Sequence, residues 1–160
     1  GSEMCIRDRG IPFGEAKEMI ERYFEAYPGV RAYLDRTIAE AKEKGYAETM
    51  FGRKRHIPEL KAANATQRGF GERTAMNHPM QGSAADIIKL AMTEVQRRIM
   101  ERGFEAKLLL QVHDELDFEC PIDEVERLTA MVQDVMEHVV DLRVPLIAEA
   151  STGITWADAK

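Results

Sequence analysis

The sequence lacks the features that mark secreted and membrane proteins. Only two of its 160 residues are cysteines, Cys5 and Cys120, and they form neither a disulfide framework nor a metal-ligand cluster. No apolar run approaches the roughly 20 residues needed to cross a bilayer, and the amino terminus has no apolar segment of the kind found in signal peptides. We therefore expect a reduced, cytoplasmic protein with no membrane partner.

Charge is unevenly distributed along the chain. The net charge is −6, with 44% hydrophobic and 31% charged residues, an ordinary balance for a soluble domain with a real core. Residues 53–81 hold six Lys and Arg against two Asp and Glu, whereas residues 121–160 hold three against eight. The first segment could face the phosphates of a nucleic acid. The alternative is that both segments are ordinary solvated faces.

Apolar residues at helical spacing predict that most of the chain is helical. Internal repeats and low-complexity segments are absent, and residues 1–9 have no periodic pattern, so we treat them as a cloning remnant or a sequence-assembly artefact. The predicted helices cover residues 14–26, about 30–44 with a glycine cap, 64–77, about 81–101 and 123–140. His78-Pro79 should break the helical backbone, because the residue before proline avoids the helical conformation.

The same spacing predicts which side chains are buried. The first two predicted helices carry a stripe of aromatic residues: Tyr23, Phe24, Tyr27 and Tyr33. We expect these side chains to lie in the core, although such a stripe could instead stack on nucleic-acid bases. The later helices are expected to bury Ala84, Ile87, Ile88, Ala91, Met92, Val95 and Ile99, and then Ile122, Val125, Leu128, Val132, Val135, Met136 and Val139.

A small basic β-hairpin is expected before the third helix. Residues 46–51 and 54–57 flank Gly52-Arg53, which reads as a turn. Arg53, Lys54 and Arg55 could lie against a DNA phosphate backbone. The alternative is an exposed edge strand that its charges protect from pairing with other chains.

A second hairpin is predicted at residues 108–119 (LLLQVHDELDFE). The residues after its turn alternate, with Leu116 and Phe118 on one face, as in a half-buried strand. The turn lacks the favoured Asn-Gly or Asp-Gly pair and holds three ionisable residues in a row: His113, Asp114 and Glu115. Because strands fix the backbone beneath it, such a tip can present carboxylates to a hard divalent cation.

Residues 111–115 (QVHDE) resemble the last catalytic motif of family A DNA polymerases, the bacterial DNA polymerase I group. Residues 73–86 (RTAMNHPMQGSAAD) resemble the segment just upstream in that family, and the order and spacing of the two motifs also fit. Residues 144–146 (VPL) and 153–156 (GITW) resemble the family's carboxyl terminus. The resemblance covers about residues 10–160 and is highly specific.

The resemblance implies an α+β fold. It implies an antiparallel palm sheet backed by helices, preceded by a mainly helical fingers segment with a small β-hairpin. Residues 10–80 would be the carboxyl-terminal part of the fingers subdomain, and residues 81–160 part of the palm subdomain. The alternation in residues 146–151 suits a strand beside the central hairpin.

The resemblance also implies DNA-directed DNA polymerase activity, a nucleotidyl transfer used in DNA replication and repair. Two Mg²⁺ ions about 3.5–4 Å apart support such a reaction. Asp114 would be a metal ligand and Glu115 an accessory catalytic carboxylate, whereas Asp117 is not expected to be catalytic. The family's second aspartate and its nucleotide-binding helix have no counterpart in this chain, so we expect a carboxyl-terminal fragment that is inactive alone.

Primer-template DNA and deoxynucleoside triphosphates are the partners that the resemblance implies for the complete enzyme. Arg73, Asn77 and Gln81 resemble family residues that touch the template–primer, where they can donate to the acceptors that every base pair presents in the minor groove. His113 resembles the family's histidine beside the primer terminus. Its alternative role is that of a turn histidine satisfied by the backbone.

Two other classes of function stay open at this point. The chain could be a noncatalytic nucleic-acid-binding module. It could also be a metal-dependent phosphohydrolase that uses His113-Asp114, although such pairs usually sit on helices with further histidines. A bound-metal measurement would separate the module from a metalloenzyme, since the module needs no metal at Asp114.

Overall fold

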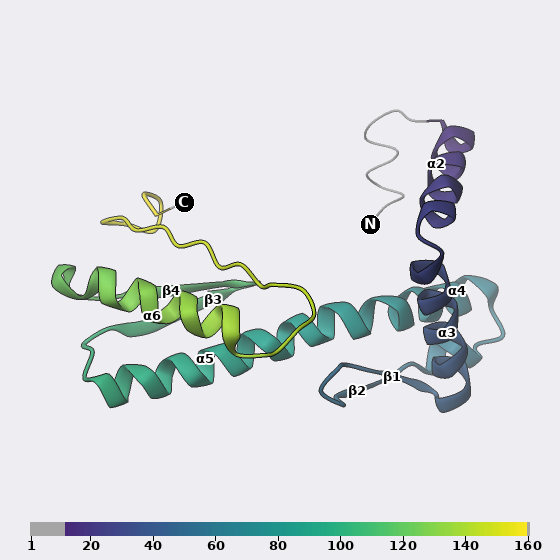
Figure 1. Cartoon of the computed structure of the whole chain (residues 1–160). Coiled ribbons are helices and arrows are strands. Elements are labelled where there is room, and N and C mark those ends of the chain that lie inside the picture. The colour runs from purple at the N-terminus through teal and green to yellow at the C-terminus, as the bar shows by residue number, and fades with distance from the viewer. Residues whose placement is uncertain (1–11, 160) are drawn as a thin grey trace. The chain divides into compact units, whose positions relative to one another are not determined.

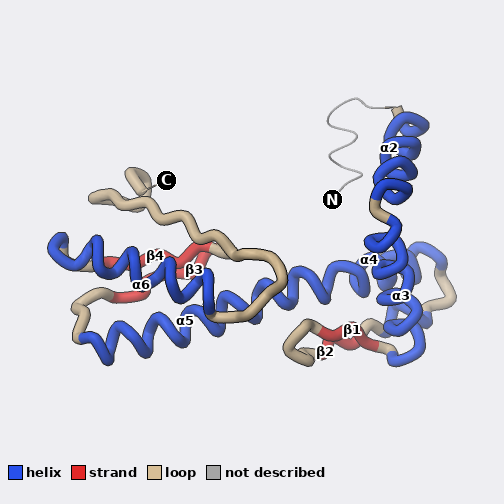
Figure 2. The backbone as a smooth tube through the Cα atoms, in the orientation of Figure 1, coloured by secondary structure: helices blue, strands red, loops and turns tan. Residues whose placement is uncertain are grey.

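The computed structural model describes residues 12–159, which divide into two compact units. The first contains residues 12–48 and 54–78, and the second contains residues 49–53 and 79–159. Helices predominate, and the described strands form short two-stranded hairpins (Figure 2). None of the helices within residues 12–159 is both long enough and apolar enough to cross a membrane.

The first unit consists of helices and a small hairpin (Figure 1). Its elements are α2 (Phe13–Ala26), α3 (Pro28–Lys44), β1 (Tyr46–Glu48), β2 (Lys54–His56), the 3₁₀ turn η1 (Pro58–Lys61) and α4 (Ala65–Asn77). Its buried cluster consists of Ala41, Ala47, Ile57, Leu60 and Ala75. A Cβ atom at Gly71 of α4 would lie 2.8 Å from the backbone nitrogen of Leu60, so the close approach of α4 to η1 requires glycine there.

Local capping residues explain where the helices of this unit begin and end. Gly45 ends α3 with a left-handed φ of 81°, and its N–H donates to the Ala41 carbonyl at 2.8 Å. Asn64 begins α4 by accepting the N–H of Thr66 at 2.8 Å. The predicted helices at residues 14–26, 30–44 and 64–77 are confirmed within one or two residues.

The aromatic stripe is not in the core, contrary to the prediction. Tyr23 is 50% exposed and Tyr27 is 57% exposed. Their rings lie 5.1 Å apart, and Tyr23 also meets Phe24 edge-on at 5.5 Å. The described part of the first unit leaves this face of α2 open, so the rings pack on one another instead of under a second layer.

The first hairpin is shorter than predicted. Tyr46 pairs with His56 and Glu48 pairs with Lys54, and the turn between the strands is Thr49–Arg53. This turn belongs to the second unit, although both strands belong to the first.

α4 ends at Asn77 as predicted, but the backbone does not leave the helical region at His78-Pro79 as the prediction required. His78 has helical dihedrals (φ −62°, ψ −43°), and a π-helical turn, η2 (His78–Gly82), follows α4 without a loop. α5 (Ser83–Arg102) follows η2 directly. Pro79 lacks the N–H that an α-helical bond needs, and the wider i→i+5 bonding of a π turn accommodates it.

The second unit packs α5 and α6 side by side against a hairpin (Figure 1). Its remaining elements are β3 (Lys107–Val112), β4 (Glu115–Glu119), the 3₁₀ turn η3 (Ile122–Glu124) and α6 (Val125–His138). Its core consists of Ala91, Val95, Ile99, Ala106, Leu128, Met131 and Val135, and Phe118 of β4 packs against it. The predicted α+β class, with an antiparallel hairpin backed by helices, is confirmed.

Three details of the predicted second unit are wrong. Ala84 is exposed, because the core of α5 begins one turn later at Ile88. Ile122 is 93% exposed, because it begins η3 and not α6. Residues 146–151 form no strand in the described chain.

Side chains of α6 hold the extended segment that follows it. Gln133 Nε2 donates to the carbonyl of Ala148 at 2.8 Å, and the N–H of Ala148 donates to Glu137 Oε1 at 3.0 Å. Both backbone groups of Ala148 are therefore satisfied by a helix, where the alternating sequence had predicted a neighbouring strand.

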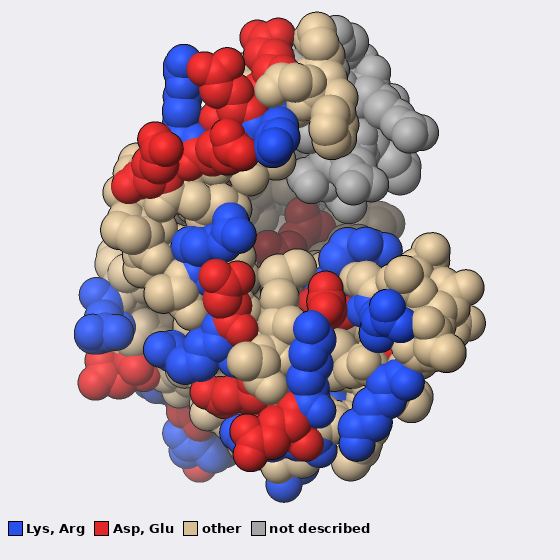
Figure 3. Space-filling model, turned by 90° about the vertical axis from the view of Figure 1, so that its right-hand side faces the viewer, with Lys and Arg blue, Asp and Glu red and all other residues tan. Residues whose placement is uncertain are grey.

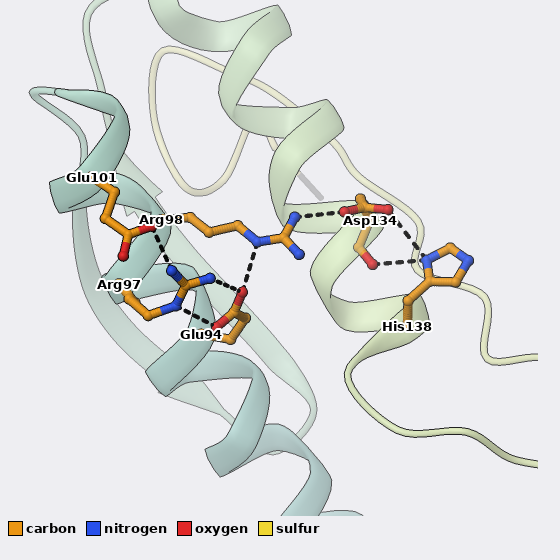
Figure 4. Close-up of polar contacts among 6 residues, drawn as sticks. All are labelled: Glu94, Arg97, Arg98, Glu101, Asp134 and His138. Carbon is orange, nitrogen blue, oxygen red and sulfur yellow. Dashed lines mark hydrogen bonds and ion pairs between the residues drawn. The ribbon is translucent and has the colours of Figure 1, made fainter.

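A charged network joins α5 to α6 (Figure 4). Arg98 donates to Glu94 of α5 at 2.8 Å and to Asp134 of α6 at 2.6 Å. Arg97 donates to Glu94 as well, at 2.6 Å. Hydrogen bonds from Arg97 and Arg98 lower the pKa of the Glu94 carboxyl to about 2.

Candidate functional site

The tip of the second hairpin is a two-residue turn. Val112 pairs with Glu115 in the β3–β4 register, so His113 and Asp114 alone form the turn. Glu115 was expected in the turn but is the first residue of β4. His113 has a φ of 56°, the only positive value among the described non-glycine residues. The side-chain amide of Gln111 donates to the His113 carbonyl at 2.9 Å and closes the turn.

The hairpin tip presents two adjacent carboxylates to solvent. Asp114 and Glu115 are both exposed. Within residues 12–159, no group of three or more His, Cys, Asp or Glu is arranged to hold a metal ion. Magnesium binds carboxylate oxygens and commonly uses only one or two of them, with water and phosphate completing its shell. Asp114 and Glu115 therefore fit part of a magnesium site and not a whole one.

The register of the hairpin sets which side chains face the core. Leu108 pairs with Phe118 and Leu110 pairs with Asp117, so Leu109 is an extra residue, a β-bulge. Asp117 lies on the face opposite Phe118, as predicted. It is not fully solvated, however, because its Oδ2 atom is buried and has no hydrogen-bond partner within the described chain.

The residues expected to touch the template–primer are all exposed. Arg73 and Asn77 lie four residues apart on α4 and therefore share one face of that helix. Gln81 is exposed in η2, in the part of that turn that belongs to the second unit.

The basic residues of the first hairpin have different surroundings. Arg53 donates through Nε to Asp86 Oδ1 at 2.7 Å and through Nη2 to the Gly82 carbonyl at 2.8 Å. Lys54 lies 3.6 Å from Glu48 and 4.8 Å from the centre of the Tyr46 ring. Among the described residues, Arg55 has no ion pair and is exposed.

Lys and Arg are interspersed with Asp and Glu over much of the described surface drawn in Figure 3. Many of these charges are paired along helices at i,i+4 spacing, as Arg22 is with Glu18 at 2.6 Å. The excess of positive charge in residues 53–81 is therefore partly neutralised by residues outside that segment, such as Asp86.

Sequence reasoning missed Asp86 and Ser83. Asp86 lies in the first turn of α5 with a side chain that is 11% exposed. Its burial opposes ionisation, but hydrogen bonding by Thr49 and Arg53 outweighs burial and holds the pKa of the Asp86 carboxyl below its usual value. The one signal in the sequence was an acidic residue in the first turn of a predicted helix. The helix dipole alone favours such a residue, so nothing in the sequence pointed to a specific partner for Asp86.

The family model described as DNA polymerase family A matches residues 3–158. This chain belongs to DNA polymerase family A. The family resemblance that residues 73–86 and 111–115 carry is thereby confirmed.

Members of family A with similar sequences come from several bacteria. DNA polymerase I of Geobacillus stearothermophilus is 53% identical over 146 residues, 91% of this chain and 17% of that protein. DNA polymerase I of Lactococcus lactis subsp. cremoris is 48% identical over 154 residues, 96% of this chain and 18% of that protein. The chain thus spans less than a fifth of the length of these relatives.

A solved family A structure has the same fold. It is the POL domain of Pol1 from M. smegmatis in complex with DNA primer-template and dNTP. The TM-score is 0.91 at 42% sequence identity, and the match covers 96% of this chain and 27% of that one.

Proposed function

We propose that this chain is the carboxyl-terminal part of a DNA-directed DNA polymerase, a nucleotidyltransferase that extends a primer on a DNA template with deoxynucleoside triphosphates. The observation that carries the proposal is an exposed Asp114 at the tip of a two-residue hairpin turn, in a fold that matches a polymerase domain at a TM-score of 0.91. Residues 10–80 then correspond to the end of the fingers subdomain, and residues 81–160 to part of the palm.

Asp114 is the residue that would hold divalent cations, with Mg²⁺ as the metal and Glu115 as an accessory carboxylate. Bound metal ions would neutralise pyrophosphate charge and align the reacting groups. The contribution of this chain is one exposed carboxylate on a backbone that paired strands and the Gln111 amide keep in place. No complete group of metal ligands exists within residues 12–159. The other ligands of such a site would therefore come from elsewhere in the complete enzyme.

The exposed donors of this chain would bind the template–primer without reading its sequence. The Arg73 guanidinium and the amides of Asn77 and Gln81 can donate to purine N3 and pyrimidine O2, the acceptors common to all base pairs in the minor groove. Lys54 and Arg55 would contact phosphates. The His113 imidazole, held beside Asp114, would lie next to the primer end.

The bacterial relatives support a role in DNA replication and repair in the cytoplasm. The alternative of a phosphohydrolase at His113-Asp114 has no support, because these residues form a hairpin turn and no group of three His, Cys, Asp or Glu within residues 12–159 is arranged to hold a metal ion. A noncatalytic DNA-binding module remains the competing function, and the following experiment separates it from a polymerase.

The test is a chimera in which this chain replaces the matching 146-residue region of G. stearothermophilus DNA polymerase I. We expect the chimera to extend a primer in the presence of Mg²⁺. Asp114→Asn keeps the side-chain shape and removes the charge that would hold the metal ions. The single-turnover extension rate should therefore fall by at least about a hundredfold, where each tenfold loss of rate corresponds to 1.36 kcal/mol of transition-state stabilisation. Affinity for primer-template DNA should change far less, because Asp114 is an anion and does not attract phosphates.

Asp117→Asn is the matched control, because it makes the same chemical change three residues further along the chain, in β4. It should leave the extension rate near that of the unsubstituted chimera. A chimera that binds DNA normally but extends nothing, with or without Asp114, would favour the noncatalytic module. If Asp117→Asn greatly lowers the extension rate while Asp114→Asn leaves it unchanged, the wrong carboxylate has been assigned as the metal ligand.

A further inference from the structure

The turn Thr49–Arg53 is a rigid five-residue structure. The Thr49 hydroxyl accepts the backbone N–H of Phe51 at 3.3 Å and that of Arg53 at 3.2 Å. The Thr49 N–H donates to the Arg53 carbonyl, and the Gly52 N–H donates to the Thr49 carbonyl, both at 3.0 Å. Thr49 is only 5% exposed. Its buried hydroxyl therefore fixes the shape of the turn from inside.

Arg53 fastens this turn to the first residues of α5. Its Nε donates to Asp86 and its Nη2 donates to the Gly82 carbonyl, at 2.7 and 2.8 Å. Two charge-assisted bonds from one planar guanidinium define both its position and its orientation. If Arg53 turned to a phosphate, it would leave the Asp86 carboxylate, 11% exposed, without its cation.

A second connection runs from the same turn to Pro79. The backbone N–H of Met50 donates to Ser83 Oγ at 2.9 Å, and Ser83 Oγ donates to the Pro79 carbonyl. The carbonyls of Pro79 and Gly82 are thus both held, directly or through Ser83, by the turn Thr49–Arg53. Gln81 lies between these two carbonyls in the chain.

We infer that Arg53 is a positioning residue, which acts through Asp86 and Gly82 to fix the backbone that presents Gln81, and that it is not a phosphate contact. This inference rests on the proposed function for the role of Gln81 toward DNA. It replaces the expectation that Arg53 binds phosphate, and it leaves that role to Lys54 and Arg55. Asp86 and Ser83 become the residues through which the turn acts.

Amide hydrogen exchange on the 160-residue chain tests the attachment itself. Arg53→Ala and Asp86→Ala should each lower the protection of amides in residues 82–88 by about tenfold, the worth of a hydrogen bond to a charged group. The double variant should lose little more than either single one, because the two side chains form one interaction. Protection of the Val135 amide in α6 is the internal reference. Unchanged protection in residues 82–88 would overturn the inference.

If Arg53→Ala lowers protection at Val135 too, the unit has unfolded and Arg53→Lys takes its place. Lysine keeps the charge but cannot donate in two fixed directions. We expect local loss of protection in residues 82–88 with Val135 unchanged. Full protection in both places would show that the fork geometry is not needed and would overturn the inference.

Primer extension by the chimera tests the link to Gln81. Arg53→Ala should slow single-turnover extension by about tenfold to a hundredfold through a displaced primer end. In a Gln81→Ala background the same substitution should slow extension no further. A general structural role would give multiplicative losses instead, and that result would overturn the positioning role.

The salt dependence of DNA binding by the chimera separates positioning from phosphate contact. Loss of one phosphate contact lowers the slope of log affinity against log salt by about 0.9. Arg55→Ala, the matched control, should show this loss, and Arg53→Ala should not. If Arg53→Ala alone lowers the slope, the inference is wrong. If the chimera does not bind DNA, the proposed function fails, whereas the exchange experiment still decides whether the turn holds α5.

Discussion

One residue with left-handed backbone geometry, His113, forms the first half of the hairpin turn. A positive φ costs an ordinary side chain roughly 1–2 kcal/mol, and glycine avoids this cost. A two-residue hairpin turn with a positive φ at its first position only, as here, is of the type that has glycine at that position. His113 is therefore tolerated against the local backbone preference, which is a common property of functional residues.

Substitution of His113 by glycine separates its backbone role from its chemical role. His113→Gly should leave the hairpin intact and raise the free energy of unfolding of this chain by about 1 kcal/mol, as thermal unfolding would measure. In the chimera the same variant should extend primers more slowly, because the imidazole beside Asp114 is gone. His113→Val is the control that should destabilise the hairpin. Normal extension by a stable His113→Gly variant would leave His113 with only a turn role.

Asp117 gives a second residue-scale prediction. Its buried Oδ2 has no partner in the described chain, and an unsatisfied buried polar atom costs about 1–3 kcal/mol. Asp117→Leu should therefore raise the free energy of unfolding by about 1 kcal/mol, measured by denaturant titration of the 160-residue chain. Asp117→Asn, which keeps a polar atom there, should change it little. A destabilised leucine variant would mean that this carboxylate has a partner.

Residue patterns predicted the position of the hairpin tip but not its backbone strain. Alternation of Leu116 and Phe118 with polar neighbours placed β4 correctly, because side-chain period is set by strand geometry alone. The bond between Arg53 and Asp86 joins residues 33 positions apart, and no local pattern encodes it. Arg53 consequently looked like a free cation of a basic hairpin.

At the scale of elements, α5 and α6 are held together by a hydrophobic core and by a network of charged side chains. Glu94 and Asp134 are carboxylates of different helices, and the Arg98 guanidinium joins them. Hydrogen bonding by Arg98 lowers the pKa of the Asp134 carboxyl, while Arg97 and then Arg98 lower that of Glu94 to about 2. Carboxylates whose pKa is depressed in the folded state add stability above their unfolded pKa and lose it as the pH falls through the folded value.

Arg98→Gln should raise the pKa of both Glu94 and Asp134, because it removes a donor to each. Arg97→Gln, a neighbour with no bond to Asp134, should raise only that of Glu94. NMR titration of the carboxyl carbons between pH 1.5 and 6 would measure both; the window brackets the unfolded and folded values for Glu94. If Arg97→Gln moves Asp134 as much as Arg98→Gln does, the two arginines act as diffuse charge and not through directed bonds.

Element boundaries were predicted well where capping residues mark them and poorly where packing decides. Gly45 and Gly103 end helices because each adopts a left-handed φ, 81° and 67°, which glycine allows at no cost. α4 ends before Pro79 as expected, but the backbone stays helical through a π turn that joins α4 to α5. The alternating residues 146–151 had the pattern of a strand, but a strand exists only when another strand pairs with it, and α6 takes that place at Ala148.

For the whole molecule, the ligand set of the hairpin tip decides what the chain can do alone. Within residues 12–159 no group of three or more His, Cys, Asp or Glu is arranged to hold a metal ion. We expect the purified 160-residue chain to show no template-dependent primer extension with Mg²⁺, in an assay where the chimera serves as the positive control. Extension above the background of an Asp114→Asn chain would show that one aspartate suffices.

The distribution of charge gives a prediction for DNA binding by the 160-residue chain. The net charge is −6, yet Lys54, Arg55 and Arg73 are exposed residues of one segment, residues 53–81, that has an excess of positive charge. We expect weak binding to duplex DNA that falls as salt rises, because bound cations are released from the phosphates. Fluorescence anisotropy at about 50 and 200 mM salt would measure it, with a Lys54→Glu, Arg55→Glu variant as control. Affinity that does not change with salt would contradict phosphate contacts.

The β-bulge at Leu109 constrains how this sequence can evolve. Leu108, on one side of the bulge, shares a face with Phe118, whereas Gln111, beyond the bulge, shares a face with Leu116. Losing one residue here would shift the alternation by half a period. Either Leu108 would turn away from Phe118, or the residues leading to Asp114 would change faces. We therefore expect homologous sequences to keep the number of residues between Leu108 and Asp114 and to carry insertions and deletions outside the β3–β4 hairpin.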